Sequence, residues 1–149
     1  MNLDDYYQMI ETVISSMGVA VKDARGRRQG QWNLNKGDVR VWIDLWMLED
    51  DERIYFQVMS PVRRLPARHE SLDFMEKLLT VNNELYGAAF TIRDGWAWLK
   101  TIRLVDGMDQ KGAERIIRRL GFYGNKYQKH LREVFGPEPN KPVHHREEE

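Results

Sequence analysis

The stretch "AAFTIRDGWAWLKTI", residues 88–102, constrains the fold of this chain more than any other short segment. Asp94 and Gly95 separate two apolar runs, and Asp-Gly is a preferred pair for two-residue hairpin turns, whose backbone suits the twist of paired strands. Such a turn places Thr91 opposite Trp98. The sequence therefore predicts an antiparallel hairpin with a defined register.

Three more strands are expected before this hairpin, over residues 30–35, 39–48 and 53–60. A tight turn at Lys36 and Gly37 would join the first two strands and place Leu34 opposite Val39. These strands would then form one antiparallel sheet with the later hairpin.

The acidic stretch "EDDE", residues 49–52, is expected to join the second and third of these strands. A four-residue loop there places Trp46 opposite Tyr55, and the same register continues along both strands. Pro61 and Pro66 are expected to end this sheet region.

Helical periodicity appears in three segments, residues 4–17, 70–86 and about 109–135. In the last one, Gly121 and Gly124 are expected to bend or interrupt the helix, because each costs about 1 kcal/mol relative to alanine. In the second helix one face is expected to carry Leu72, Met75, Leu78, Leu79, Asn82 and Leu85. A buried amide must find partners, so Asn82 is expected to tie this helix to a loop or a strand end.

The resulting order is α-β-β-β-α-β-β-α, which predicts an α+β fold with an antiparallel sheet packed against helices. With 149 residues the chain is expected to form one domain over residues 1–136. The charged, glycine-flanked segment 22–30 is expected to be an exposed loop. Residues 137–149, rich in proline and charge, are expected to be a disordered tail.

The predicted registers sort the strand residues onto two faces. The first face is apolar and is the expected core: Trp32, Leu34, Val39, Val41, Ile43, Leu45, Met47, Ile54, Phe56, Val58, Phe90, Ile92, Ala97 and Leu99. The second, which we call the aromatic face, collects Arg40, Trp42, Asp44, Trp46, Tyr55, Gln57, Met59, Thr91, Arg93, Trp96, Trp98 and Lys100.

The composition of the aromatic face is typical of an interface, because Trp, Tyr, Met and Arg are enriched in such patches. We expect partners to be bound through Trp42, Trp46, Tyr55, Met59, Trp96 and Trp98, with Arg40 and Lys100 supplying orientation. Three alternatives remain open. The last helix or the first one covers this face as ordinary core, a second copy of the chain covers it in a homodimer, or another protein or ligand binds there.

The sequence carries no catalytic signature. It has no cysteine, no nucleophile elbow, no phosphate loop and no dinucleotide fingerprint, so an enzyme is not expected. His69 and Glu70 lack a second histidine four residues on and are interpreted as a surface pair. His144 and His145 lie in the predicted tail, where a preorganised metal site is not expected. We therefore expect neither a cofactor nor a metal.

Charge is balanced overall, with 23 basic and 23 acidic residues, which gives no global attraction to nucleic acid or membrane. Residues 111–132 are locally basic, and a helix with this face is the alternative hypothesis, a binder of nucleic acid or another anionic ligand. The N-terminus lacks the basic start and apolar run of a signal peptide, and no stretch is long enough for a membrane helix. A soluble, cytoplasmic protein is expected.

With these elements in order, the chain resembles the YbjN family of bacterial sensory transduction regulators, which is similar in fold to type III secretion chaperones. The resemblance rests on "VMSPVRRLP", "LLTVNNEL" and "AFTIRDGWAWLKTIRL" followed by Met108, and it covers roughly residues 1–135. It implies a small α+β domain, often dimeric, that binds protein segments rather than performing catalysis. Secretion chaperones hold extended effector segments against their dimer surface, so the resemblance favours a chaperone-like or regulatory homodimer with a protein client.

Overall fold

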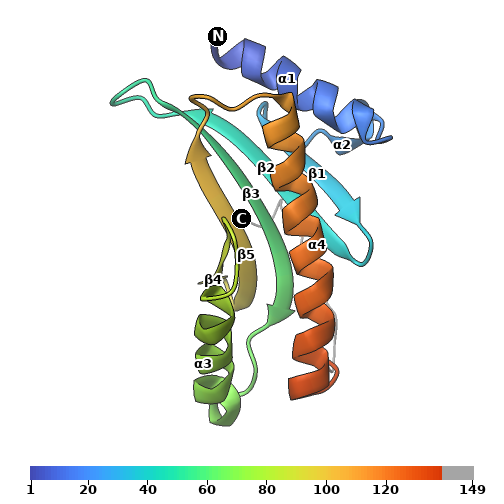
Figure 1. Cartoon of the computed structure of the whole chain (residues 1–149), viewed down its shortest axis with the longest axis vertical. Helices are drawn as coiled ribbons and strands as arrows, with labels where there is room; N and C mark the ends of the chain where they lie inside the picture. Colours follow the sequence, from blue (N-terminus) through green and yellow to red (C-terminus); the bar gives the residue numbers. More distant parts are fainter. Residues whose placement is uncertain (139–149) are drawn as a thin grey trace.

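A computed structural model describes residues 1–138 of the protein (Figure 1). Within this range the elements are α1 (Leu3–Ser16), α2 (Val21–Ala24), β1 (Gln31–Lys36), β2 (Val39–Met47), β3 (Ile54–Arg64), η1 (Arg68–Glu70), α3 (Ser71–Asn82), β4 (Ala89–Arg93), β5 (Trp96–Leu104) and α4 (Gln110–Phe135). The segment expected to be an exposed loop thus begins with the short helix α2. The rest of the predicted tail, residues 139–149, lies outside the described residues.

The five strands form one antiparallel sheet in the order β1-β2-β3-β5-β4. The predicted Asp-Gly hairpin is confirmed, since Thr91 pairs with Trp98 and both turn residues have positive φ, 51° at Asp94 and 80° at Gly95. The loop at 49–52 also has the predicted register, with Trp46 opposite Tyr55. Turn chemistry was sufficient to predict both registers.

The first hairpin differs from its prediction by two residues. Its turn is Gly37–Asp38, so that Lys36 pairs with Val39, and Leu34 lies opposite Val41 instead. The reason is a contact from α4: the Asn125 side chain accepts a hydrogen bond from the Asp38 N–H (3.0 Å) and donates one to the Lys36 carbonyl (2.7 Å). Because the shift is an even number of residues, every side chain stays on its predicted face.

β3 continues past Pro61, where the sequence had been expected to end the sheet. The register with β5 shifts between Pro61 and Arg63, which inserts Val62 as a bulge and buries it in the core. β2 pairs with β3 only as far as Met59, so Pro61 occupies a part of the strand where a missing N–H is tolerated.

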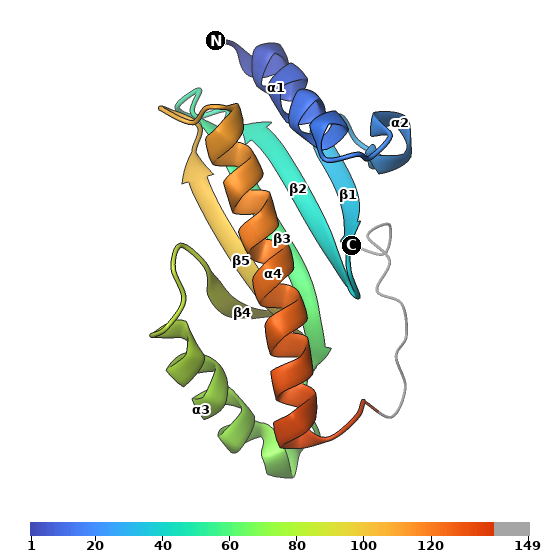
Figure 2. The same cartoon turned by 45° about the vertical axis from the view of Figure 1, so that its right-hand side comes forward.

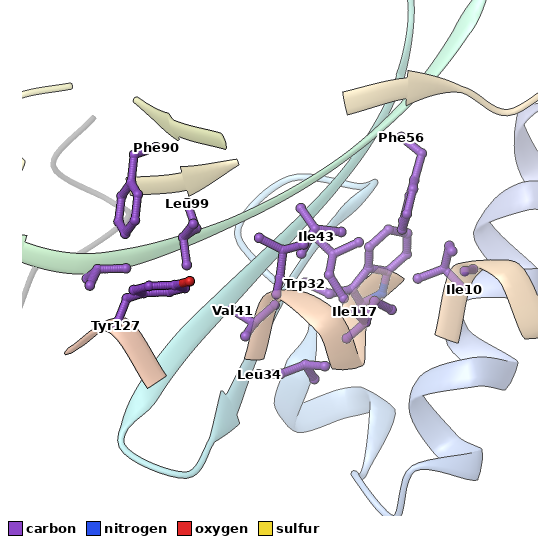
Figure 3. Packing of buried hydrophobic residues seen from close by; sticks show 14 of the residues in the cluster. Ile10, Trp32, Leu34, Val41, Ile43, Phe56, Phe90, Leu99, Ile117 and Tyr127 are labelled. Carbon is purple, nitrogen blue, oxygen red and sulfur yellow. The ribbon is translucent and has the colours of Figure 1, made fainter. Parts of the chain in front are cut away.

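Figures 1 and 2 show α4 running along one face of the sheet, with α1 near one end of it and α3 near the other. The buried side chains of all three helices belong to one core with the sheet's first face. Figure 3 shows this core, with Tyr127 of α4 below Phe90 and Leu99, and Ile117 close to Trp32. Two residues predicted for this core lie near strand ends and are half exposed, Met47 (46%) and Ile92 (47%).

α4 is one unbroken helix, which corrects the expectation of a bend at its glycines. Both glycines are buried where the helix approaches the strands. A Cβ on Gly124 would lie 3.0 Å from both Ser60 Oγ and Val39 Cγ2, and one on Gly121 would lie 2.9 Å from Lys36 Cβ. The glycines therefore bring the helix close to the sheet rather than interrupting it.

The buried stripe of α3 also differs from the prediction. Phe74, Leu78 and Val81 face the core, whereas Leu72 and Leu79 are 77% and 70% exposed. The Phe74 ring packs edge to face on Phe135 at the end of α4 (5.2 Å between ring centres), and this contact determines which stripe is buried. Near the end of this helix, Asn82 holds β4 as expected: its Oδ1 accepts a hydrogen bond from the Phe90 N–H (2.6 Å), and its Nδ2 donates to the Phe90 carbonyl (3.4 Å).

Candidate binding face

The structure places all eight candidate binding residues on the aromatic face. Cross-strand pairing aligns Trp42 with Met59 and Lys100, Trp46 with Tyr55, and Trp98 with Thr91, while Arg40 and Trp96 lie two residues along from Trp42 and Trp98. The side chains that α1 and α4 bury belong to the core on the opposite face. Neither helix covers the aromatic face, so the first of the three alternatives is excluded.

Four of the candidates form a separate buried cluster, Trp42, Met59, Trp96 and Trp98. The Trp42 and Trp98 rings lie 4.9 Å apart at 59°. The Trp98 indole donates a hydrogen bond to the Arg93 carbonyl (3.0 Å), and this side chain is fully buried. These residues form a rigid floor rather than the exposed anchors that the sequence predicted.

Trp46 and Tyr55 form a second aromatic pair farther along the same face. Their rings stack at 5.8 Å with 21° between the planes, and both side chains are half buried. The neighbouring row contains Ile102, which is 46% exposed and pairs with Gln57. Sequence reasoning missed Ile102 because it ended the face at Lys100, although the strand's period of two continues to it.

A groove of about 520 Å³ runs along this face. The aromatic groove, as we call it, is lined by Arg27, Arg28, Gln29, Gly30, Gln31, Asn33, Trp42, Asp44, Leu45, Trp46, Gln57, Met59 and Arg93. Three arginines and one aspartate border a floor of two tryptophans and a methionine. Such a surface can bind a segment by apolar contact and by charge-assisted hydrogen bonds.

One wall of the groove is the loop at residues 26–31, which the sequence analysis did not connect with the aromatic face. Gly30 is held tightly against β2: its carbonyl accepts a hydrogen bond from the Leu45 N–H (2.8 Å), and its φ is 84°. A Cβ there would lie 2.5 Å from the Leu45 carbonyl oxygen, so only glycine fits.

Glu11 of α1 supports the same loop from the opposite face. It accepts two hydrogen bonds from Arg25 (2.8 and 2.9 Å) and one from the Trp32 indole (3.0 Å). The hydrogen bonds from Arg25 lower the pKa of Glu11 from its usual value, and burial opposes them only partly. The loop is thus fixed to α1 by a charged side chain.

The basic residues of α4, the basis of the alternative hypothesis, do not form a comparable site. Arg118 pairs with Glu114 of the same helix (3.4 Å), and Arg119 donates to the Tyr86 carbonyl (3.2 Å). Over residues 1–138, no group of three His, Cys, Asp or Glu side chains is placed to hold a metal. No helix in that range is both long and apolar enough to cross a bilayer.

Solved structures show what class of protein this fold defines. A chain in the crystal structure of the ExsC–ExsE complex matches with a TM-score of 0.65 at 13% identity, over 88% of this chain and 97% of that one. A chain of the HopA1–SchA chaperone–effector complex matches with a TM-score of 0.60 at 9% identity, over 83% and 93%. The predicted α+β fold of the type III secretion chaperone kind is confirmed.

The chain belongs to the YbjN family, described as "Putative bacterial sensory transduction regulator", whose model matches residues 6–133. The structure of YbjN from E. coli, described as a transcription regulator, is similar at a TM-score of 0.52 and 15% identity, over 85% of this chain and 90% of that one. No curated protein matches the sequence.

Proposed function

We propose that this protein is a non-enzymatic, cytoplasmic chaperone or regulator that binds an extended segment of another protein in the aromatic groove. The family and the chaperone–effector complexes of similar fold support a protein-binding role. The observation that carries the proposal is the aromatic groove itself, a hollow on the sheet face away from the core that α1 and α4 share.

The groove divides the binding work between two kinds of side chain. The buried tryptophan cluster keeps the floor rigid, so little conformational entropy is lost when a segment binds. Trp46 is the half-buried aromatic residue that lines the groove, which makes it the proposed hot spot. Arg27 and Arg28 on the loop are exposed and would orient the segment by its acidic groups.

The homodimer is a second part of the proposal. The sequence had favoured the aromatic face as its seam, but the structure adds another apolar surface, Leu72, Met75 and Leu79 along the outer side of α3. Leu72 and Leu79 are two helical turns apart and lie on the same side of the helix. A dimer formed through α3 would leave the aromatic groove available for a client, and we propose this arrangement.

Site-specific photocrosslinking in the native host tests the client site. A photoreactive residue at position 46 is expected to capture a defined polypeptide, whereas one at Phe122, exposed on the outer side of α4, is the matched control and should not. In the purified complex, Trp46→Ala should weaken binding at least about 30-fold, as for a hot-spot aromatic residue. Equal capture at both positions, or an unchanged affinity of Trp46→Ala, would contradict the proposed site.

A further inference from the structure

The last described residue, Glu138, is attached to the end of β3 beside the aromatic face. Its Oε1 accepts a hydrogen bond from the Arg64 N–H (2.7 Å). The Arg64 guanidinium lies over the Trp96 ring at 5.8 Å, and the sheet pairs Trp96 with Arg93, which lines the aromatic groove. The chain therefore leaves α4 at Gly136 and arrives within one cross-strand row of the groove.

The eleven residues after Glu138 are long enough to follow the whole groove. From Arg64 to Gln57 along β3 is about 23 Å at about 3.3 Å per residue. Residues 139–149 can span up to about 36 Å when extended. The anchor at Glu138 also keeps the local concentration of this segment high, in the millimolar range for a short flexible link.

The segment and the groove are complementary in two independent ways. "PNKPVHHREEE" begins with Pro139, Pro142 and Val143, and proline-rich extended segments bind aromatic-lined grooves because little ordering entropy is lost. It contains three consecutive glutamates, Glu147 to Glu149, and the groove is lined by three arginines against Asp44 alone. Proline over tryptophan near the anchor would bring these glutamates toward Arg27 and Arg28.

We propose that residues 139–149 bind in the aromatic groove of their own chain, with the prolines over the Trp42–Trp46 side and the glutamates at Arg27 and Arg28. The docking does not depend on the proposed function. Its regulatory consequence does: an external client segment would have to displace the chain's own segment before it could bind.

Indole N–H signals in NMR spectra of the full chain provide the test, with each of the five tryptophans assigned by substitution with phenylalanine. One variant removes the acidic contacts, Glu147→Gln, Glu148→Gln and Glu149→Gln together. A second removes the apolar contacts, Pro139→Ser, Pro142→Ser and Val143→Ser together. Each should shift the Trp42 and Trp46 signals and leave Trp32, on the opposite face of the sheet, unchanged.

The matched control neutralises three exposed acids on and just after α3: Asp73→Asn, Glu76→Gln and Glu84→Gln. It should leave the Trp42 and Trp46 signals unshifted. If both segment variants leave these two signals in place, the docking proposal is wrong. If the shifts depend on protein concentration, the segment comes from a second copy and the intrachain proposal is likewise wrong. Photocrosslinking from position 46 judges the client site separately.

Discussion

At the scale of single residues, Asn82 holds β4 to the end of α3 with both atoms of its amide. Replacing it with alanine would leave the partly buried Phe90 N–H without its partner. We expect Asn82→Ala to lower the free energy of unfolding by about 1–3 kcal/mol. Urea denaturation measures this change. Asn83→Ala, at an exposed neighbouring position, should change stability by less than about 0.5 kcal/mol, and equal effects of the two variants would contradict the assignment.

Glu11 leads to a prediction about pH, because its pKa is lowered in the folded protein by the hydrogen bonds from Arg25. A carboxylate with a lowered folded pKa contributes stability above its unfolded pKa, near 4.5, and loses it as the pH falls through the folded value. Glu11→Gln should therefore be less stable than the wild type at pH 7. The difference should shrink as the pH falls below 4.5 in denaturation series, and a difference independent of pH would contradict this role.

Some residues could be assigned from the sequence and others could not, for a physical reason. Asn82 stood out because a polar amide interrupts an apolar stripe, which is a local signal. Asn125 carries no such signal, since its partners at residues 36 and 38 are distant in sequence and lie close only after α4 packs on the sheet. The shifted turn of the first hairpin has the same origin.

At the scale of elements, α4 depends on its glycines for close approach to the sheet. Gly124→Ala would gain up to about 1 kcal/mol of helix propensity but would force a methyl group against buried Ser60 and Val39. Overpacking of this kind costs about 1–3 kcal/mol, so we expect net destabilisation of about 1 kcal/mol or more in thermal or urea unfolding. Lys129→Ala, exposed on the same helix, should be nearly neutral. A stabilised Gly124→Ala variant would contradict the packing argument.

The outer side of α3 supports a prediction about assembly. Leu79→Glu places a charge on a side chain that is 70% exposed, so it should leave the fold intact and disrupt a dimer formed through α3. Light scattering is expected to report a monomer for Leu79→Glu and a dimer for both wild type and Trp46→Glu. The opposite pattern would move the dimer seam to the aromatic face, where the sequence had placed it.

Strands were easier to place from the sequence than helix faces. The turns at 49–52 and 94–95 set the register through local chemistry, so the paired residues and both sheet faces could be read in advance. The stripe of α3 could not, because leucines occur around much of the helix and the contact between Phe74 and Phe135 decides which ones are buried. The bulge at Val62 depends in the same way on pairing with β5.

At the scale of the whole molecule, the sequence predicted a sheet with an unusual aromatic face but not what covers it. Which face the helices choose depends on the summed packing of α1, α3 and α4, and no local pattern contains that sum. The aromatic groove was equally hidden, because its loop wall and its strand floor come from separate segments. The candidate residues could therefore be gathered on one face, while their division into a buried floor and a half-buried pair required the structure.

The strand order β1-β2-β3-β5-β4 has a consequence for synthesis on the ribosome. β3 pairs on one side with β2, which is already made, but its other partner, β5, emerges only after α3 and β4. Until residue 104 has been translated, the long edge of β3 has no partner and its aromatic side remains open to other nascent chains. A nascent chain interrupted within α3 would thus be a template for aggregation, and rapid passage through this interval favours correct folding.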